Sequence, residues 1–337
     1  MKSLNLKFIL VLTLSFFVFV FLNKQKLFES FDSEMVSRYL RSQDILDETS
    51  RIKDRIFVSD EEIYIASGYL YANGARPTEY NFQHPPFIKY LFGLSSKYFN
   101  MPLIPNIIFA GILIFEVFLL GKLVFKNELI GLVASLLLMF DPVFREVTVY
   151  ALLDLGQIVF ILGFIITTFF WKKNWVGQGV LLGLALASKF YSPVVIFYCL
   201  IVLYKLAIKQ LTINHEVKVL AFAFLAFSIC YFKSFPFNII FYQAKIVKFM
   251  LDHNQAVEWG GVLKMFFGGY FLWPILFFVN LYQLFRSKFA SVQFLLFLIP
   301  ISYFLILMFQ LPFTRYFILI LPFLYLSFGN FLIKKII

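Results

Sequence analysis

The run Val147–Trp171, VTVYALLDLGQIVFILGFIITTFFW, decides the fold class of this chain, because it is long, apolar and carries one charge, at Asp154. A helix needs about 20 mostly apolar residues to cross the hydrocarbon core of a bilayer. Similar runs recur on both sides of it, at Phe8–Leu22, Leu103–Gly121, Leu129–Phe140, Val176–Ala187, Pro193–Tyr204, Val217–Phe232, Val262–Phe285, Val292–Gln310 and Tyr316–Ile333. We therefore predict an all-α, polytopic integral membrane protein with about ten spanning helices, in a range of about nine to eleven.

The composition agrees with a membrane protein and excludes several other classes. Of the 337 residues, 61% are hydrophobic and 15% are charged, and the mean hydropathy is +0.83. Soluble domains have about 45–50% apolar and about 25% charged residues. A soluble, disordered or fibrous chain is therefore excluded. The two cysteines, Cys199 and Cys230, lie in apolar runs and lack the spacing of a disulfide framework or a metal site.

The charge distribution predicts how the chain is oriented in the membrane. Asn23–Pro102 is nearly neutral, with ten Lys/Arg and eleven Asp/Glu, whereas the rest of the chain has twenty and eight. If the N-terminus is cytoplasmic, every inner segment holds at least two Lys/Arg, as the positive-inside rule requires. Three short outer turns hold one cation each, at Arg145, Lys189 and Arg315. We expect a multi-pass protein of the cell membrane, with no nucleic-acid partner and with Asn23–Pro102 on the extracytoplasmic face.

These segments predict one membrane domain over residues 1–337, with no separate soluble domain. It would consist of a first span at 8–22, a first extracytoplasmic loop at 23–102 and the remaining spans at 103–333. The first span could instead belong to a signal peptide. No small-residue cleavage site follows it, however, so we expect an uncleaved anchor.

Local signals in the first outer loop predict amphipathic helices next to the membrane. Apolar residues recur at helical spacing from Leu27 to Leu40, which is typical of a helix on the membrane surface. Ser59-Asp60-Glu61-Glu62 predicts a capping box that opens a second helix, and Asn73-Gly74 predicts its end. A third helix is expected to begin at Pro85-Pro86.

Two groups of polar residues in this loop are candidates for catalysis or substrate binding. The simpler interpretation of Asp60-Glu61-Glu62 is that acids in the first turn complement the helix dipole. The simpler interpretation of His84-Pro85-Pro86-Phe87-Ile88-Lys89 is a loop that ends at prolines and leads into a helix. Yet the Pro-Pro step directs His84 at a helix N-terminus, where an anion is favoured, and Lys89 lies one turn further in.

Both groups resemble motifs of a known enzyme class. Asp60-Glu61 followed by Tyr64 resembles the acidic motif that opens the first outer loop of the membrane-integral glycosyltransferases of the C superfamily. His84-Pro85-Pro86-x-x-Lys89 is similar to a motif of the dolichyl-phosphate-mannose protein mannosyltransferases, and the bacterial aminoarabinose (lipid A) transferases show a related pattern. The similarity continues, with elements at Leu152-Leu153-Asp154, Ser188-Lys189-Phe190 and Thr314-Arg315-Tyr316.

The resemblance covers roughly residues 1–200 well and the rest loosely, and two positions depart from it. Ile88 stands where the family has glycine before the motif lysine. Arg145 lies well before Asp154, displaced from the family's arginine, which puts its role in doubt.

The resemblance implies an enzyme that moves a sugar, in the first instance mannose, from a polyprenyl-phosphate donor on the outer face of the membrane. The acceptor would be a protein Ser/Thr, a glycolipid or an envelope glycan. Asp60 would be the catalytic base and Glu61 the alternate base. Substrate-binding roles are expected for Tyr64, His84, Lys89, Asp154, Arg145, Lys189 and Arg315.

Among these residues, the three outer-turn cations are expected to hold the phosphate, since an anionic headgroup explains a cation on the outer side. The alternative is that short outer turns simply tolerate one cation each. Asp154 is expected to pair with Lys189 or Arg145 before it acts in catalysis. The motifs require no cofactor; if a divalent metal binds, Asp60 and His84 are its candidate ligands.

Two other classes of protein remain open. A transporter or lipid flippase would carry ionisable residues deep in several spans and paired halves with broken helices. Glu116 is the one deep acid in this chain, and the two halves do not match. A structural or assembly protein would use its acids only to cap helices.

Overall fold

The computed structural model describes residues 5–44, 56–234, 239–253, 260–309, 311 and 313–336. Across these ranges the molecule is helical, and the β-type pairing found there is one isolated bridge between Ser42 and Ile56. The elements are α1 Leu6–Leu22, α2 Lys24–Leu27, α3 Glu34–Leu40, α4 Asp60–Ala72, α5 Phe87–Phe99, α6 Ile104–Phe125, α7 Glu128–Met139, α8 Pro142–Val149, α9 Asp154–Phe170, α10 Trp175–Ser188, α11 Ser192–Ala207, α12 Ile213–Cys230, η2 Phe232–Ser234, α13 Ile239–His253, α14 Gly261–Gly269, α15 Leu272–Arg286, α16 Val292–Leu307, η4 Thr314–Leu319 and α17 Leu321–Ile336.

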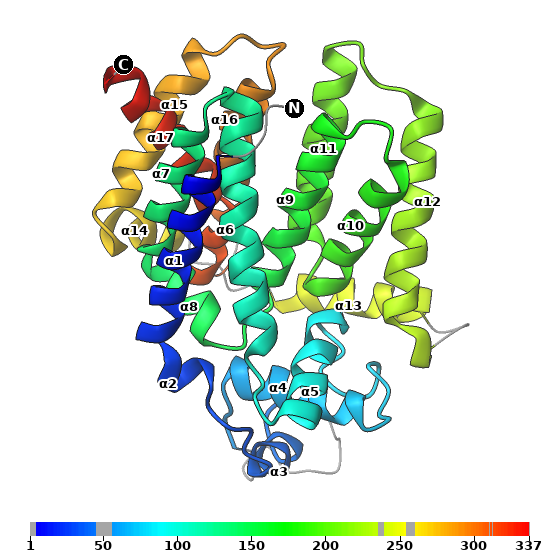
Figure 1. Ribbon diagram of the computed structural model, residues 1–337. Helices are drawn as coiled ribbons and strands as arrows, with labels where there is room; N and C mark the ends of the chain where they lie inside the picture. The colour runs from blue at the N-terminus through cyan, green and yellow to red at the C-terminus, as the bar shows by residue number, and fades with distance from the viewer. Residues whose placement is uncertain are drawn as a thin grey trace.

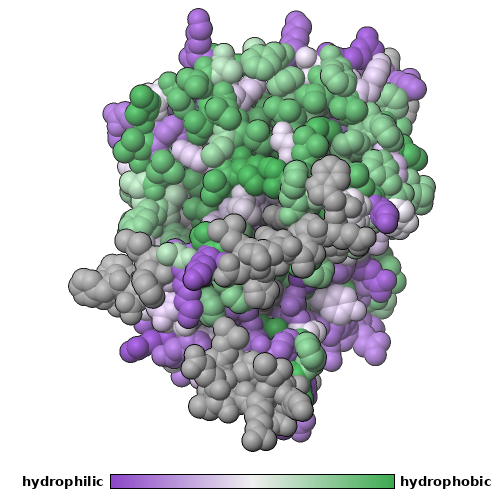
Figure 2. Space-filling model, turned by 180° about the vertical axis from the view of Figure 1, so that it is seen from behind, coloured by the Kyte–Doolittle hydropathy of each residue, from purple (hydrophilic) through white to green (hydrophobic). Residues whose placement is uncertain are grey.

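The long apolar helices form one bundle, and α3, α4 and α5 lie together at one end of it (Figure 1). The start of α1 and the end of α17 lie at the opposite end, while α13 runs crosswise between the bundle and the α4–α5 pair (Figure 1). On the face that Figure 2 shows, hydrophobic side chains form a broad belt, and hydrophilic side chains gather below it and also project above it. This distribution is that of a membrane protein, and we call the end formed by α3, α4 and α5 the cap.

Helix length identifies fewer membrane spans than the apolar runs predict. In the described ranges, α6 and α12 are each long and apolar enough to cross a membrane. Two bent pairs, α8 with α9 and α14 with α15, would raise the number to four if each pair is one broken span. Other apolar helices have 10–17 residues, and at about 1.5 Å per residue they are shorter than a hydrocarbon core of about 30 Å. The number of about ten spans therefore stays a prediction.

The run Val147–Trp171 is not one continuous helix, contrary to the expectation of a single span. Its first residues belong to α8, and the chain then turns by 112° into α9. The amide of Asn106 on α6 donates to the carbonyl oxygens of Val147, Thr148 and Tyr150, at 3.2, 3.1 and 2.7 Å. The break is stable because a distant side chain satisfies the carbonyl groups that the helix end leaves open.

Two further runs differ from expectation in the same way. Val262–Phe285 divides into α14 and α15, with a bend of 104°. The single surface helix expected from Leu27 to Leu40 is also incomplete: α2 ends at Leu27, and the chain is helical again only from Glu34 to Leu40, in α3. Residues 45–55 of the same outer loop lie outside the described ranges.

The helices expected after Ser59 and after Pro85-Pro86 are confirmed as α4 and α5. They cross where Gly68 of α4 meets Gly93 of α5, and each glycine lies directly against the backbone of the other helix. A Cβ atom at either position would collide with main-chain atoms, which cannot move aside. This close crossing fixes the start of α4 relative to the loop that precedes α5, and thus brings Asp60 and His84 to one side of the cap.

Candidate active site

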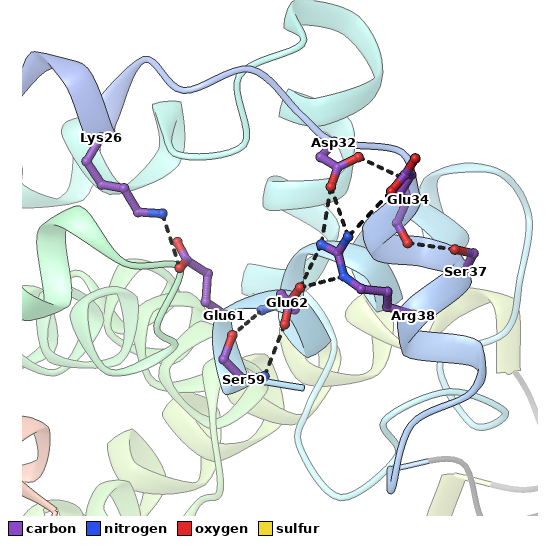
Figure 3. A network of polar contacts seen from close by, with 8 residues as sticks. All are labelled: Lys26, Asp32, Glu34, Ser37, Arg38, Ser59, Glu61 and Glu62. Carbon is purple, nitrogen blue, oxygen red and sulfur yellow. Dashed lines mark hydrogen bonds and ion pairs between the residues drawn. The ribbon is translucent and has the colours of Figure 1, made fainter. Parts of the chain in front are cut away.

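The first turn of α4 presents its three acids to different surroundings. Ser59 Oγ accepts a hydrogen bond from the Glu62 amide at 3.2 Å, and the Ser59 amide donates to Glu62 Oε2 at 3.3 Å. Glu62 also pairs with Arg38 on α3, at 2.8 Å (Figure 3). The predicted capping box is confirmed, and Glu62 has a structural role.

Glu61 faces the break between α8 and α9. Its carboxylate lies 3.4 Å from Lys26 Nζ (Figure 3). It also accepts a hydrogen bond from the Ala151 amide at 3.3 Å. Burial raises the pKa of Glu61, while the charge of Lys26 opposes the rise. This position is outside the cavity that Asp60 lines, so the role of alternate base stays a prediction without geometric support.

Asp60 contacts an arginine from the far end of the chain. Arg315 Nη2 lies 2.5 Å from Asp60 Oδ2, and Arg315 Nε lies 4.0 Å from Asp154 Oδ2. Asp154, the first residue of α9, pairs with Lys189 at the end of α10, at 2.5 Å. The expected partner of Asp154 was Lys189 or Arg145, and the structure confirms Lys189. Two acids and two cations thus converge from α4, α9, α10 and η4.

The loop that carries His84 is fastened from within by Lys89. Lys89 Nζ donates to Asn81 O at 2.7 Å, to Asn81 Oδ1 at 2.9 Å and to His84 O at 2.8 Å. The lysine is fully buried, and burial lowers its pKa to about 7 although the Asp44 carboxylate acts in the opposite direction. Lys89 does not line the cavity, so its geometry is that of a residue that positions His84.

The imidazole of His84 lies in the cavity wall, edge-on to the ring of Tyr64, with 5.7 Å between ring centroids. Burial is the main reason that its pKa is well below the usual value, and the charges of Lys189, Lys89 and Arg315 lower it further. His84 is therefore neutral at physiological pH, and it can donate one hydrogen bond and accept another.

A cavity of about 430 Å³ joins these groups. It is lined by six of the nine predicted site residues, which are Asp60, Tyr64, His84, Asp154, Lys189 and Arg315. Three buried polar atoms on its lining residues have no hydrogen-bond partner: His84 Nδ1, Gln157 Oε1 and Arg315 Nε. Buried polar atoms are almost always paired, so these three atoms are available to a polar ligand or to water.

Arg145 lies elsewhere. Its Nε donates to Asn23 Oδ1 at 2.9 Å, and it lines a different, larger and more apolar cavity beside α1. The structure therefore brings two of the three outer-turn cations together and leaves the third apart.

The sequence analysis missed several polar residues of the cavity wall, among them Asp44 and Gln157. Asp44 accepts hydrogen bonds from Tyr39 at 2.9 Å and from Asn81 at 3.0 Å, and no motif marks it. Gln157 lies on α9 three residues after Asp154, a spacing that places both side chains on one helix face. That spacing was a usable signal.

The residues present are a poor fit for a divalent metal. Asp60 and His84 both line the cavity, but they share it with Lys189 and Arg315, whose charges repel a cation. In the described ranges, no group of three or more His, Cys, Asp or Glu could hold a metal ion.

Comparisons with known proteins give structural matches only. No protein-family model and no curated protein sequence matches the chain. Two solved structures of ArnT from Cupriavidus metallidurans are similar to the chain, each at 14% identity over 94% of it. The structure bound to undecaprenyl phosphate has a TM-score of 0.65, and the apo structure has 0.63. The chain spans 60% and 59% of the length of those ArnT chains. The resemblance to the bacterial aminoarabinose transferases is thus confirmed at the level of the fold, which this chain shares with the two ArnT structures.

Proposed function

We propose that the chain is a multi-pass membrane glycosyltransferase that transfers a sugar from a polyprenyl-phosphate donor to an acceptor hydroxyl. Its N-terminus would be cytoplasmic and its active site would face the extracytoplasmic side. The observation that carries this proposal is the position of Arg315, in contact with Asp60 and close to the Asp154–Lys189 pair, in a cavity with unpaired polar atoms. The ArnT fold, known in a complex with undecaprenyl phosphate, supports a donor of this class.

Asp60 is the base in this mechanism. It removes the proton of the acceptor hydroxyl while that oxygen attacks the anomeric carbon. The bond between the anomeric carbon and the phosphate oxygen breaks with inversion, and the electron pair leaves with the phosphate. The proton ends on the Asp60 carboxylate.

Arg315 and Lys189 hold the leaving phosphate. A guanidinium has five N–H donors, so Arg315 can contact the phosphate while one nitrogen still orients Asp60. Lys189 adds a point charge, and Asp154 orients its ammonium group, at 2.5 Å. The phosphate is a good leaving group, and its negative charge is the main thing that the site must stabilise.

The unpaired atoms of His84 and Gln157 suit hydroxyl groups of a sugar. Gln157 Nε2 already donates to Phe190 O at 3.1 Å, which leaves its Oε1 to accept from the ligand. A mannose-like sugar and a protein Ser/Thr, glycolipid or envelope-glycan acceptor form the finer part of the proposal. A panel of polyprenyl-phosphate sugars, with the product identified by mass spectrometry, tests both identities.

Replacing Asp60 is the direct test of the mechanism. Asp60→Asn keeps the size of the side chain and removes the base, so turnover in proteoliposomes should fall by about 10²- to 10⁴-fold. The matched control is Glu34→Gln, an exposed acid on α3, which should keep the wild-type rate. Wild-type turnover by the Asp60→Asn protein would refute the assignment.

Donor binding separates this enzyme from the alternative of a transporter or lipid flippase. Binding of a labelled polyprenyl-phosphate sugar should weaken in Arg315→Ala and Lys189→Ala. Solute or lipid flux across liposomes without donor consumption would favour transport instead.

A further inference from the structure

The cavity beside α1 is the larger of the two, at about 870 Å³. Its walls come from the C-terminal half of α1, the α7–α8 junction and the α14–α15 junction. Along α1 the lining runs from Leu14 to Asn23, a length of about 13 Å at about 1.5 Å per residue. Val18 and Phe140 are 57% and 81% exposed, so the cavity is an apolar groove that is open on its side.

One basic side chain stands in this groove. Arg145 is exposed, and its Nε donates to Asn23 Oδ1 at 2.9 Å. Asn23 is itself held, because its Nδ2 donates to Phe19 O at 2.8 Å. In the part of the chain that the structure describes, no carboxylate pairs with Arg145. Its two terminal nitrogens remain for an anion.

The acid that also lines the groove has its hydrogen-bond partners inside the protein. Asp141 is fully buried, and its Oδ2 accepts hydrogen bonds from Trp273 Nε1 at 2.9 Å and from the Tyr325 hydroxyl at 2.8 Å. Its Oδ1 accepts from the Val143 amide at 2.8 Å, as the N-cap of α8. Both oxygens are therefore occupied by internal donors.

We propose that this groove binds one bilayer phospholipid, with its phosphate on Arg145 and an acyl chain along α1. Charge complementarity and the apolar lining favour this occupant. A phosphodiester carries one negative charge, and one cation stands in the groove. The lipid-linked sugar donor of the proposed function is also a phosphodiester, but the other cavity offers that donor and the phosphate monoester left after transfer two cations, Lys189 and Arg315.

The lipid site is connected to the candidate active site through α8. Glu146, the neighbour of Arg145, accepts a hydrogen bond from Thr314 Oγ1 at 3.0 Å, and Thr314 precedes Arg315. A phospholipid that orders α8 at Arg145 therefore also stabilises the position of Arg315. Turnover, if the proposed function holds, depends on the lipid in the groove.

Native mass spectrometry of the purified full chain tests the binding without reference to any activity. The probe is phosphatidylglycerol. Diacylglycerol with the same acyl chains is the comparison ligand, because it lacks the phosphate that Arg145 would contact. Arg145→Ala should weaken phosphatidylglycerol binding at least roughly tenfold, since hydrogen bonds to a charged group are lost. Val18→Trp should weaken it by filling the groove while the cation stays in place. Arg76→Ala, an exposed arginine outside both cavities, is the matched control and should bind as the wild type does.

Two results would overturn the proposal: equal phosphatidylglycerol binding by wild type, Arg145→Ala and Val18→Trp, or preferential occupation of the Arg145-dependent site by undecaprenyl phosphate. Where turnover is measurable, Arg145→Ala should also abolish its stimulation by phosphatidylglycerol. A loss of all turnover with intact Arg145-dependent lipid binding would count against the proposed function and leave the lipid site in place.

Discussion

His84 is a buried imidazole close to three cations, and this environment makes the stability of the folded chain depend on pH. The folded pKa of His84 is well below 6.5, the value that an unfolded histidine retains. Below about pH 6.5 the unfolded chain therefore binds a proton that the folded chain does not bind. The contribution of His84 to the free energy of unfolding falls as the pH drops through this window, by up to about 1.4 kcal/mol per pH unit, and is constant above it.

Thermal unfolding in detergent between about pH 5 and about pH 7.5 measures this effect. The His84→Asn protein has no group that titrates at this position, so its unfolding temperature should fall less steeply on acidification than that of the wild type. Equal slopes for the two proteins would contradict a neutral His84.

Lys89 gives a second prediction at the same scale. Lys89→Met leaves three oxygens, on Asn81 and His84, without their donor, and each unsatisfied buried group costs about 1–3 kcal/mol. We expect a loss of roughly 2–4 kcal/mol in the free energy of unfolding. The matched control is Lys97→Met on the same helix, where the lysine is exposed and donates to Ala72 O. Weaker donor binding at unchanged stability would favour the direct substrate contact that the motif suggests.

At the scale of elements, the α4–α5 crossing is the most sensitive point of the cap. Gly68→Ala or Gly93→Ala would push the two helix backbones apart, at a cost of about 3 kcal/mol or more. Asp60 and His84 would move with them, so turnover should fall together with the unfolding temperature. The matched control is Gly268→Ala on α14. An added Cβ atom there would have no neighbour within 4 Å, so this change should be neutral or slightly stabilising. A Gly68→Ala protein with wild-type stability would show that the helices can separate at no cost.

Local signals predicted α4 and α5, but periodicity did not predict the break between α8 and α9. The capping box at Ser59 and the prolines before Phe87 act within a few residues of the helix ends that they define. The break depends instead on Asn106, whose amide contacts carbonyl groups 41 to 44 residues away. A hydrophobic run cannot reveal a turn whose hydrogen bonds come from another helix.

On the scale of the whole molecule, the positive-inside pattern predicts that the cap lies outside the cell. In a chain with Cys199→Ser and Cys230→Ser, Asn73→Cys in the cap should react with a membrane-impermeant maleimide on intact cells. Ala290→Cys, in the turn between α15 and α16, should react only after permeabilisation. The reverse labelling would invert the predicted orientation.

The same pattern predicted part of the candidate site. It marked Arg145, Lys189 and Arg315 as cations on the less basic side, and two of the three converge on Asp154. A charge rule assigns a side of the membrane, but helix packing decides which outer turns meet. The rule therefore could not show that Arg145 lies apart from the other two cations, or that tertiary structure brings Asp44 and Gln157 to the cavity.

The ion pair between Asp60 and Arg315 joins residues that are 255 positions apart. Ribosomes add about 5–20 residues per second, so the arginine is made about 13–50 s after the aspartate. During that interval the growing chain carries its acid without the cation that completes the cavity. The order of synthesis thus delays assembly of the charged cavity, whose full set of charges is complete only when the last helices of the chain have joined the bundle.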